Sequence, residues 1–294
     1  MRNKTKEPLV SIIVNCHNGE KYLSETLKSI QFQTYKNYEV IFFDNCSTDN
    51  SLKIFRQFND TRFKYFLSKD KIKLYNARNL ALDECNGEIV TFLDTDDLWK
   101  LDKLELQVAE MTQNPETGLC YSYYEIYNQS KNRTKLIKPK LSKNIKNYLL
   151  KRYDIALVSI AIKKEYLQKH NLRFNSDFDI IGDFDLVLNL SHFCQFSLIK
   201  KNLCIYRDHK ESETNNNYEK LVREMQNWYD ENLNNKIFSN CGNIDHIKNK
   251  IYYYQGLDFL KKNELEKFKL NLNNLGHNMY KFKLYMKFIL KKII

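Results

Sequence analysis

Glycine and proline are scarce in this chain, which has only 7 Gly and 3 Pro among its 294 residues. That composition excludes a collagen-like chain and a Gly- or Pro-rich disordered one. Hydrophobic residues make up 43% of the sequence and charged residues 28%, a balance that permits a substantial core. The length suffices for one large α/β domain with a smaller C-terminal element, or for two domains.

Paired cysteine motifs and long apolar segments are also missing. The seven cysteines form no Cys-x-x-Cys pair, and their scattered positions indicate free thiols in a reducing compartment. Residues 1–8 are too polar for a secretory signal, and no stretch reaches the roughly 18 apolar residues that span a bilayer. We therefore expect a cytoplasmic protein, either free or peripheral at the inner face of the plasma membrane.

Basic residues exceed acidic ones, 47 to 36, which gives a formal net charge of +11. Such an excess suits phosphorylated ligands, anionic membrane surfaces or nucleic acid. The sequence has no arginine-rich segment and no recognisable nucleic-acid-binding motif, so nucleic acid is not an expected partner. A solvated, lysine-rich surface accounts for most of the charge.

Short apolar runs alternate with segments of helical periodicity in the first part of the chain. The pattern predicts strands at 9–14, 38–43, 63–67 and 88–93, with helices between them and a further helix at 100–111. Ser47 or Thr48 is the expected N-cap of the helix around residues 52–58. This order indicates βαβ units in an α/β fold with a mostly parallel sheet.

The second part of the chain has a looser pattern. We expect a strand at 119–127, a polar loop at 128–140, a strand at 156–162, a short helix to about 170, a helix at 183–193 and a strand at 196–206. From about residue 215 the periodicity is helical throughout. The predicted organisation is a catalytic domain over 1–214 and a helical C-terminal region over 215–294.

Polar clusters follow three of the predicted strands, at Asn15–Asn18, Asp44–Asp49 and Asp94–Asp97. Ligands bind at the carboxyl ends of parallel strands, so these clusters should converge on one crevice. In the third, Asp94-Thr95-Asp96-Asp97, the carboxylates repel one another unless a cation lies between them, and such oxygen ligands favour Mg²⁺ or Mn²⁺. The alternative is that Asp96 or Asp97 caps the following helix, which needs only one acid.

These motifs, in this order, resemble family 2 glycosyltransferases with the GT-A fold. The similar segments are Val10–Val14, Asn18–Leu23, Leu27–Ile30, Gln33–Tyr35, Asp44 with Ser47–Asp49, Asn76–Asn79 and Phe92–Trp99. The resemblance implies that Asp44 binds the nucleotide base, most often uracil. It also implies that Arg78 lies near the diphosphate, Asp94 near the ribose or diphosphate, and that Asp96 ligates the metal.

The resemblance extends to the catalytic base and the end of the domain. Asp183, in Ile181-Gly182-Asp183-Phe184-Asp185, falls on the family's base, and Asp185 is the alternative. Gly182 replaces an acid that usually precedes the base. Asp183 could equally begin a helix favourably at its positive end. His209, in a Tyr-Arg-x-His segment, would complete the metal site or contact the diphosphate.

The loops expected to hold the nucleoside depart from the family pattern. Asn15-Cys16-His17-Asn18 stands where Pro-Thr-Tyr-Asn is usual, and Asp44-Asn45-Cys46-Ser47 where Asp-Asp-Gly-Ser is usual. We therefore place Asn15, His17, Asn18 and Thr95 with the donor-binding residues, with His17 stacking on the base in place of Tyr.

The last segment, Tyr280–Ile294, has helical periodicity with two kinds of face. Lys283, Lys287 and Lys291 share one stripe, and the opposite side carries Phe282, Tyr285, Met286, Ile289, Leu290 and Ile293. A basic amphipathic helix of this kind either lies in a membrane interface or packs on the domain, and the sequence leaves both open.

Together these features predict an inverting, metal-assisted glycosyltransferase that moves a sugar from a UDP-sugar to a glycan or lipid-linked glycan, in surface polysaccharide or lipooligosaccharide synthesis. Two alternatives remain at this point. One is a nucleotidyltransferase on a related sheet, and the other is a basic domain that binds membrane or polymer through a degenerate site.

Overall fold

The computed structural model describes residues 7–209, 217–233, 244–276 and 279–293. These residues form two compact units, the first within Met1–Ile145 and Asp154–His209 and the second within Lys146–Tyr153 and Lys210–Ile294. The predicted domain boundary between residues 214 and 215 lies outside the described residues.

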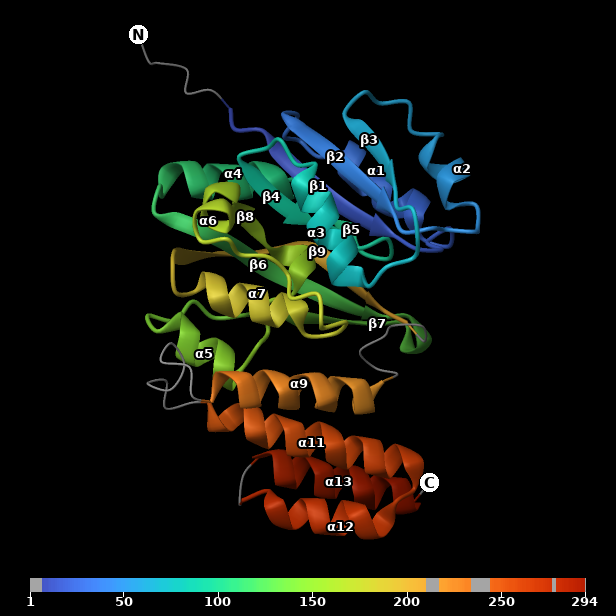
Figure 1. The fold of residues 1–294 in the computed structure, drawn as a ribbon, viewed down its shortest axis with the longest axis vertical. Coiled ribbons are helices and arrows are strands. Elements are labelled where there is room, and N and C mark those ends of the chain that lie inside the picture. The colour runs from blue at the N-terminus through green and yellow to red at the C-terminus, as the bar shows by residue number, and fades with distance from the viewer. Residues whose placement is uncertain (1–6, 210–216, 234–243, 277–278, 294) are drawn as a thin grey trace. The chain divides into compact units, whose positions relative to one another are not determined.

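The first unit begins with the predicted alternation of strands and helices (Figure 1). Its elements are β1 (Val10–Cys16), α1 (Leu23–Gln31), β2 (Tyr38–Asp44), α2 (Ser51–Phe55), β3 (Phe63–Leu67), α3 (Leu74–Asp83), β4 (Ile89–Phe92), β5 (Leu98–Trp99) and α4 (Lys103–Gln113). Strands β1 to β4 are parallel, and every residue of β1, β2 and β4 is buried. Continuous apolar runs of this kind are typical of strands covered on both faces.

The sheet is completed by later, partly antiparallel strands. The elements are β6 (Thr117–Asn128), η1 (Gln129–Lys131), β7 (Arg133–Ile137), η2 (Leu157–Ser159), β8 (Ala161–Lys163), α6 (Lys164–Lys169), α7 (Gly182–Leu190) and β9 (Gln195–Asp208). The strand order is β3-β2-β1-β4-β8-β6-β9-β5, with β7 paired to the outer part of β6. The expected α/β fold with a mixed sheet is confirmed, but the sheet is not mostly parallel, because four of its strand pairs are parallel and four are antiparallel.

Several local predictions were wrong. The segment 128–140 is not a loop throughout, because Arg133–Ile137 pairs with β6 as β7. The strand predicted at 156–162 is reduced to β8 at Ala161–Lys163, and Leu157–Ser159 forms a 3₁₀ turn instead. The N-cap of α2 is Asn50, not Ser47 or Thr48. The carboxylate of Asp49 accepts the amide hydrogen of Ser51 at 3.0 Å and so performs part of the capping role.

The second unit is helical, as predicted. It contains α5 (Ile145–Lys151), α9 (Tyr218–Asn232), α11 (Asp245–Lys262), α12 (Leu265–Asn274) and α13 (Met279–Ile293). Leu257, Leu260, Phe268, Leu275 and Leu284 form its own buried cluster. Within the part of the chain that the structure describes, no helix combines the length and apolar character needed to cross a bilayer.

Candidate active site

The carboxyl ends of β1 and β2 lie next to each other, with Cys16 paired to Asp44. The two loops that follow are joined by hydrogen bonds. The Asn18 amide donates to Ser47 Oγ at 3.0 Å, and Asn18 Oδ1 accepts from the Thr48 amide at 2.8 Å. Asn18 has a φ of 55°, a left-handed conformation that Asn tolerates better than most residues. The side chain of Asn18 therefore stabilises the loops that would hold the nucleoside.

His17 is exposed at this edge of the sheet, and its ring is held by the chain. Its Nδ1 lies 2.8 Å from the carbonyl oxygen of Asn45. Because a carbonyl oxygen only accepts, Nδ1 carries the hydrogen and Nε2 is left as the acceptor when the ring is neutral. The amide of Asn45 in turn bonds the backbone of Ile72 through both its nitrogen and its oxygen.

Asn15 carries a buried amide that has no hydrogen-bond partner among the described residues. Its side-chain nitrogen and oxygen are both shielded, and the residue is only 8% exposed. Buried polar groups are rarely left unpaired, since each costs about 1–3 kcal/mol. An orphaned amide at the carboxyl end of β1 fits a position that a ligand or an ordered water completes.

Asp44 is 2% exposed and already engages the chain with both carboxylate oxygens. The Ser47 amide donates to Oδ1 at 2.8 Å, and the hydroxyl of Tyr65 donates to Oδ2 at 2.7 Å. A carboxylate has about four acceptor positions, so Asp44 can still accept from a base. Burial and the bond to Asp44 raise the pKa of Tyr65, which keeps its hydroxyl protonated as the donor.

Arg78 and Asp94 form a direct ion pair, with 2.5 Å between Nη2 and Oδ1. The Arg78 side chain is buried, whereas the Asp94 side chain is 39% exposed and can reach a ligand. Burial alone would lower the pKa of Arg78, but Asp94, Tyr75 and Asp183 together outweigh burial and raise it. The guanidinium also lies 5.3 Å from the ring centre of Tyr75. A fixed, charged guanidinium is thus present beside Asp94, directly after β4.

Asp96 faces His209, with 2.8 Å between Oδ2 and Nε2. Burial and the neighbouring carboxylate of Asp94 raise the pKa of Asp96, although contact with His209 opposes the shift. The sequence placed both residues at the metal, and the structure brings their side chains together. Thr95 lies at the same turn, 3.0 Å from the Cβ position of Gly19, so the β1 and β4 loops approach each other closely.

Asp97 has a different role from its neighbours. Its side chain is buried, and Oδ1 accepts the backbone amide of Arg207 at 2.8 Å. The Arg207 guanidinium donates to the carbonyl of Asp96 at 2.8 Å and to Glu25 at 2.7 Å, and lies 4.3 Å from the ring centre of Tyr22. Asp97 and Arg207 therefore fix the acidic turn against β9 and α1.

The alternative in which Asp96 or Asp97 caps a helix is wrong. The turn is followed by β5, and the next helix, α4, begins at Lys103 with Asp102 as its N-cap residue. The close acidic groups therefore lack a capping explanation. Burial, followed by the charges of Asp96 and Asp94, raises the pKa of Asp97 well above its usual range.

Asp183 lies in the first turn of α7, so it also benefits from the positive end of that helix. Its amide donates to the hydroxyl of Tyr75 at 3.3 Å. Its charge raises the pKa values of both Tyr75 and Arg78, which places it in the same cluster. The alternative, Asp185, accepts a hydrogen bond from Asn189 at 3.1 Å within its own helix.

Gly182 is pressed against the ring of Tyr75. A Cβ atom at position 182 would lie 2.6 Å from Tyr75 Cε2, which is closer than side chains pack. Tyr75 itself is 2% exposed and donates to the carbonyl of Ile180 at 3.0 Å. The acid that the family usually has before its base is therefore absent for a steric reason, because a tyrosine ring occupies the adjoining space.

No group of three His, Cys, Asp or Glu side chains that could hold a metal occurs among the described residues. Mg²⁺ in nucleotide sites commonly uses one or two protein ligands and takes the rest from phosphates and water. Asp96 and His209 fit that smaller set. Asp94 is adjacent but is already paired with Arg78.

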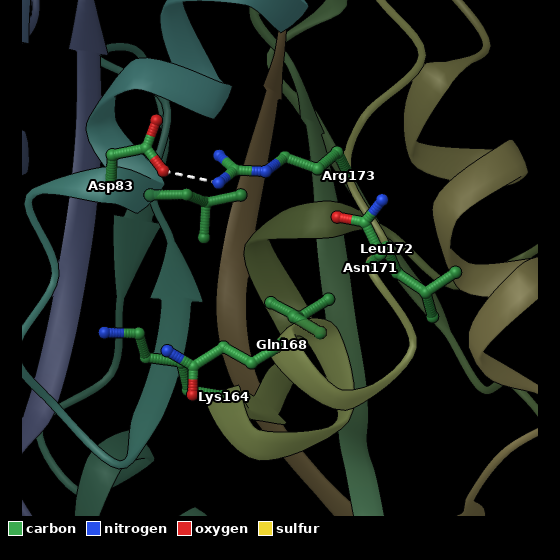
Figure 2. A pocket seen from close by; sticks show the side chains of 8 residues that line it. Asp83, Lys164, Gln168, Asn171, Leu172 and Arg173 are labelled. Carbon is green, nitrogen blue, oxygen red and sulfur yellow. Dashed lines mark hydrogen bonds and ion pairs between the residues drawn. The ribbon is translucent and has the colours of Figure 1, made fainter.

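Two cavities lie away from these residues. The one in Figure 2 has about 130 Å³ and is bordered by Asp83 and Arg173, whose ion pair spans 2.5 Å. It is too small for a nucleotide-sugar, since ligand pockets usually have about 300–1,000 Å³. The other, of about 540 Å³, lies near Pro8 and Ile89, at the amino ends of β1 and β4. Neither includes a predicted site residue.

Three residues of the site were not assigned a role from the sequence: Tyr65, Tyr75 and Arg207. Arg207 stands two positions before His209 in the segment that drew attention to the histidine. Tyr75 directly precedes the Asn76–Asn79 motif. Tyr65 lies in a strand of ordinary composition, and no pattern distinguishes it.

Comparisons with known proteins find relatives that are named glycosyltransferases. The chain is 33% identical over 166 residues to UDP-Glc:alpha-D-GlcNAc-diphosphoundecaprenol beta-1,3-glucosyltransferase WfgD of Escherichia coli. That alignment covers 56% of this chain and 64% of that protein, so the chain spans less than two thirds of this relative. The chain is also 28% identical over 226 residues to the putative teichuronic acid biosynthesis glycosyltransferase TuaG of Bacillus subtilis, covering 69% of this chain and 88% of that one.

Solved structures share the fold at low sequence identity. The mannosyltransferase PcManGT from Pyrobaculum calidifontis, in complex with GDP-Man and Mn²⁺, matches with a TM-score of 0.66 and 18% identity over 97% of this chain and 81% of that one. S. aureus TarS 1-349 in complex with UDP matches with a TM-score of 0.59 and 18% identity, covering 85% and 71% of the two chains. The sequence pattern described as Glycosyl transferase family 2 matches residues 11–180, more than half of the chain. This chain therefore belongs to glycosyl transferase family 2 and has the GT-A fold.

Proposed function

We propose that this protein is an inverting, metal-assisted glycosyltransferase that uses a UDP-sugar and transfers the sugar to a hydroxyl of a glycan or lipid-linked glycan. The observation that carries the proposal is the cluster at the carboxyl ends of β1, β2 and β4, where the Arg78–Asp94 pair, the Asp96–His209 pair and Asp183 lie together. The cluster combines fixed positive charge, carboxylates and a candidate base.

The donor assignment rests on the loops and on the relatives. Asp44 keeps free acceptor positions for a base, the exposed ring of His17 is held for stacking, and the unpaired amide of Asn15 adds a buried polar contact. WfgD is named for UDP-Glc and a diphosphoundecaprenol-linked acceptor, and TarS has been solved with UDP-GlcNAc. These names support a UDP-sugar and a lipid-linked acceptor in a surface polysaccharide pathway.

In the proposed reaction, the acceptor oxygen attacks the anomeric carbon while the bond from that carbon to the diphosphate oxygen breaks. The hydroxyl proton passes to the carboxylate of Asp183, and the nucleoside diphosphate leaves with the bonding electrons. Arg78 stabilises the negative charge that grows on the diphosphate. A divalent metal held by Asp96 and His209 would supply further stabilisation of that charge.

Donor binding tests the assignment of the metal and diphosphate residues. Thermal unfolding would be measured with UDP-, GDP-, CMP- and dTDP-sugars, with and without Mn²⁺. A UDP-sugar at a hundred times its Kd should stabilise the wild type by about 2.7 kcal/mol. Asp96→Asn should lose the part of this stabilisation that depends on Mn²⁺. Asp102→Asn, which removes a carboxylate six residues further on, should keep it. An unchanged response of Asp96→Asn contradicts the metal assignment.

Turnover tests the base separately from binding. Asp183→Asn should bind the donor normally but lower kcat about 10²–10⁴-fold. Asp185→Asn should stay near the wild-type rate, since Asp185 is engaged by Asn189. Released nucleoside diphosphate supports the proposal. Pyrophosphate released from a nucleoside triphosphate would instead identify a nucleotidyltransferase.

A further inference from the structure

The last described helix, α13, packs against the other helices of the second unit through only one of its faces. Leu284 is fully buried in that unit's apolar cluster, and the ring of Phe288 stacks on Phe268 with 5.2 Å between ring centres. Lys291 Nζ donates to the carbonyl of Leu260 on the same side. These contacts account for one side of the helix and leave its opposite side to be explained.

The opposite side is apolar and exposed. Five large side chains there are between 40% and 65% exposed, a set we call the outer face: Met279, Phe282, Tyr285, Met286 and Leu290. At about 100° per residue, all five fall within an arc centred opposite Leu284. Single exposed apolar residues are ordinary, but five on one helical face indicate an interaction surface.

The charge of α13 indicates which kind of partner the outer face would bind. The sequence of α13, MYKFKLYMKFILKKI, contains five lysines and no acidic residue. Lys283 and Lys287 are exposed and border the outer face on one side. Long lysine side chains can hold their ammonium groups at the level of lipid phosphates while the neighbouring apolar side chains enter the bilayer. An aromatic, apolar face with a lysine border is complementary to an anionic lipid surface.

A second copy of the chain is a poorer occupant. Pairing two outer faces would bring two helices with five lysines each together without an acidic residue to offset them. We propose that the outer face of α13 docks the protein on anionic lipid bilayers. This surface is independent of the catalytic residues, so its failure would leave the proposed transfer reaction untouched.

The test is co-sedimentation of the full chain with vesicles of phosphatidylcholine alone and of phosphatidylcholine with phosphatidylglycerol. We expect binding to the anionic vesicles and little binding to the neutral ones. Phe282→Ser combined with Leu290→Ser should weaken binding at least tenfold, and Lys283→Gln combined with Lys287→Gln should do so by about tenfold. Phe32→Ser is the matched control, because Phe32 and Phe282 are both 62% exposed but lie in different units.

Circular dichroism and Mn²⁺-dependent donor binding would show that each variant is folded. The proposal is overturned if the chain does not bind anionic vesicles, if the outer-face variants bind as the wild type does, or if Phe32→Ser weakens binding equally. A dimer in light scattering that the outer-face variant dissociates would assign the surface to a second copy instead.

Discussion

Gly182 and Tyr75 are best considered as a pair. The Cβ of any other residue at position 182 would meet the Tyr75 ring at 2.6–2.7 Å, and that ring is fixed by its bond to Ile180. Helix propensity alone would favour Ala over Gly by about 1 kcal/mol. Overpacking a rigid site costs typically about 1–3 kcal/mol, and here the penalty falls on a buried aromatic ring.

We therefore expect Gly182→Ala to lower the free energy of unfolding by about 1–2 kcal/mol, measured by urea denaturation. In a Tyr75→Ser background the same substitution should cost much less, because the ring that causes the clash is gone. The double-mutant cycle therefore predicts a coupling between the two substitutions, in which removal of the ring reduces the cost of Gly182→Ala. If Gly182→Ala stabilises the protein in both backgrounds, helix propensity dominates and the steric explanation for the missing acid fails.

For single residues, the sequence predicted which side chains lie near one another, but it did not predict the contacts that hold them in place. The roles of Asp94, Asp96 and Asp183 were assigned through the resemblance to family 2 glycosyltransferases, whose motifs can be recognised along the sequence. Arg207, whose backbone and guanidinium hold the acidic turn, acts across more than a hundred residues, and no local pattern carries that information. Likewise, the burial of Asp97 and the partial exposure of Asp96 depend on where β9 lies in the tertiary structure.

Helix α4 contains a buried lysine that has no carboxylate partner among the residues that the structure describes. Lys103 Nζ donates to Thr91 at 3.0 Å and to Gln107 at 2.7 Å, and it lies 3.9 Å from the ring centre of Trp99. Burial lowers the pKa of Lys103 to about 8. Keeping the charged form in the folded protein at neutral pH therefore costs about 3 kcal/mol relative to an exposed lysine.

The stability of the protein should consequently depend on pH through this residue. Between about pH 8 and pH 10.5 the unfolded chain binds the proton and the folded chain does not, so stability rises with pH across that window. The free energy of unfolding would be measured with urea for the wild type and for Lys103→Met from pH 8 to 9.5. Over this range we expect the stability of the wild type relative to Lys103→Met to increase by up to about 2 kcal/mol. Lys53→Met, at an exposed lysine, should show no such shift. If the stability difference between the wild type and Lys103→Met does not change with pH, the lowered pKa of Lys103 is contradicted.

Elements with strong local patterns were predicted well, and those that depend on pairing were not. Strands β1 and β2 are buried runs whose apolar residues are visible in the sequence. Strand β7 has the sequence RTKLI, is almost wholly exposed and exists because it pairs with the outer part of β6. The two-residue strand β5 depends in the same way on its antiparallel partner β9.

On the scale of the whole molecule, each unit has a buried cluster of its own among the described residues. The cluster of the first unit is built on β1, β2, β4 and the helices beside them, whereas that of the second joins α11, α12 and α13. The change of periodicity near residue 215 predicted the helical character of the C-terminal region. It could not predict that α5, far earlier in the sequence, also belongs to the second unit, because that depends on tertiary contacts.

Binding of donor and metal should therefore stabilise the two units unequally. The predicted ligand contacts all lie in the first unit, so a UDP-sugar with Mn²⁺ should slow amide hydrogen exchange in the loops at 15–19, 44–49 and 94–97. Exchange in α11 and α12 should change little, because their amides are protected by a different cluster. Mass spectrometry of peptic peptides resolves these segments. Asp96→Asn should abolish the Mn²⁺-dependent protection, and equal slowing in both units would show that they respond to the ligand as one cooperative body.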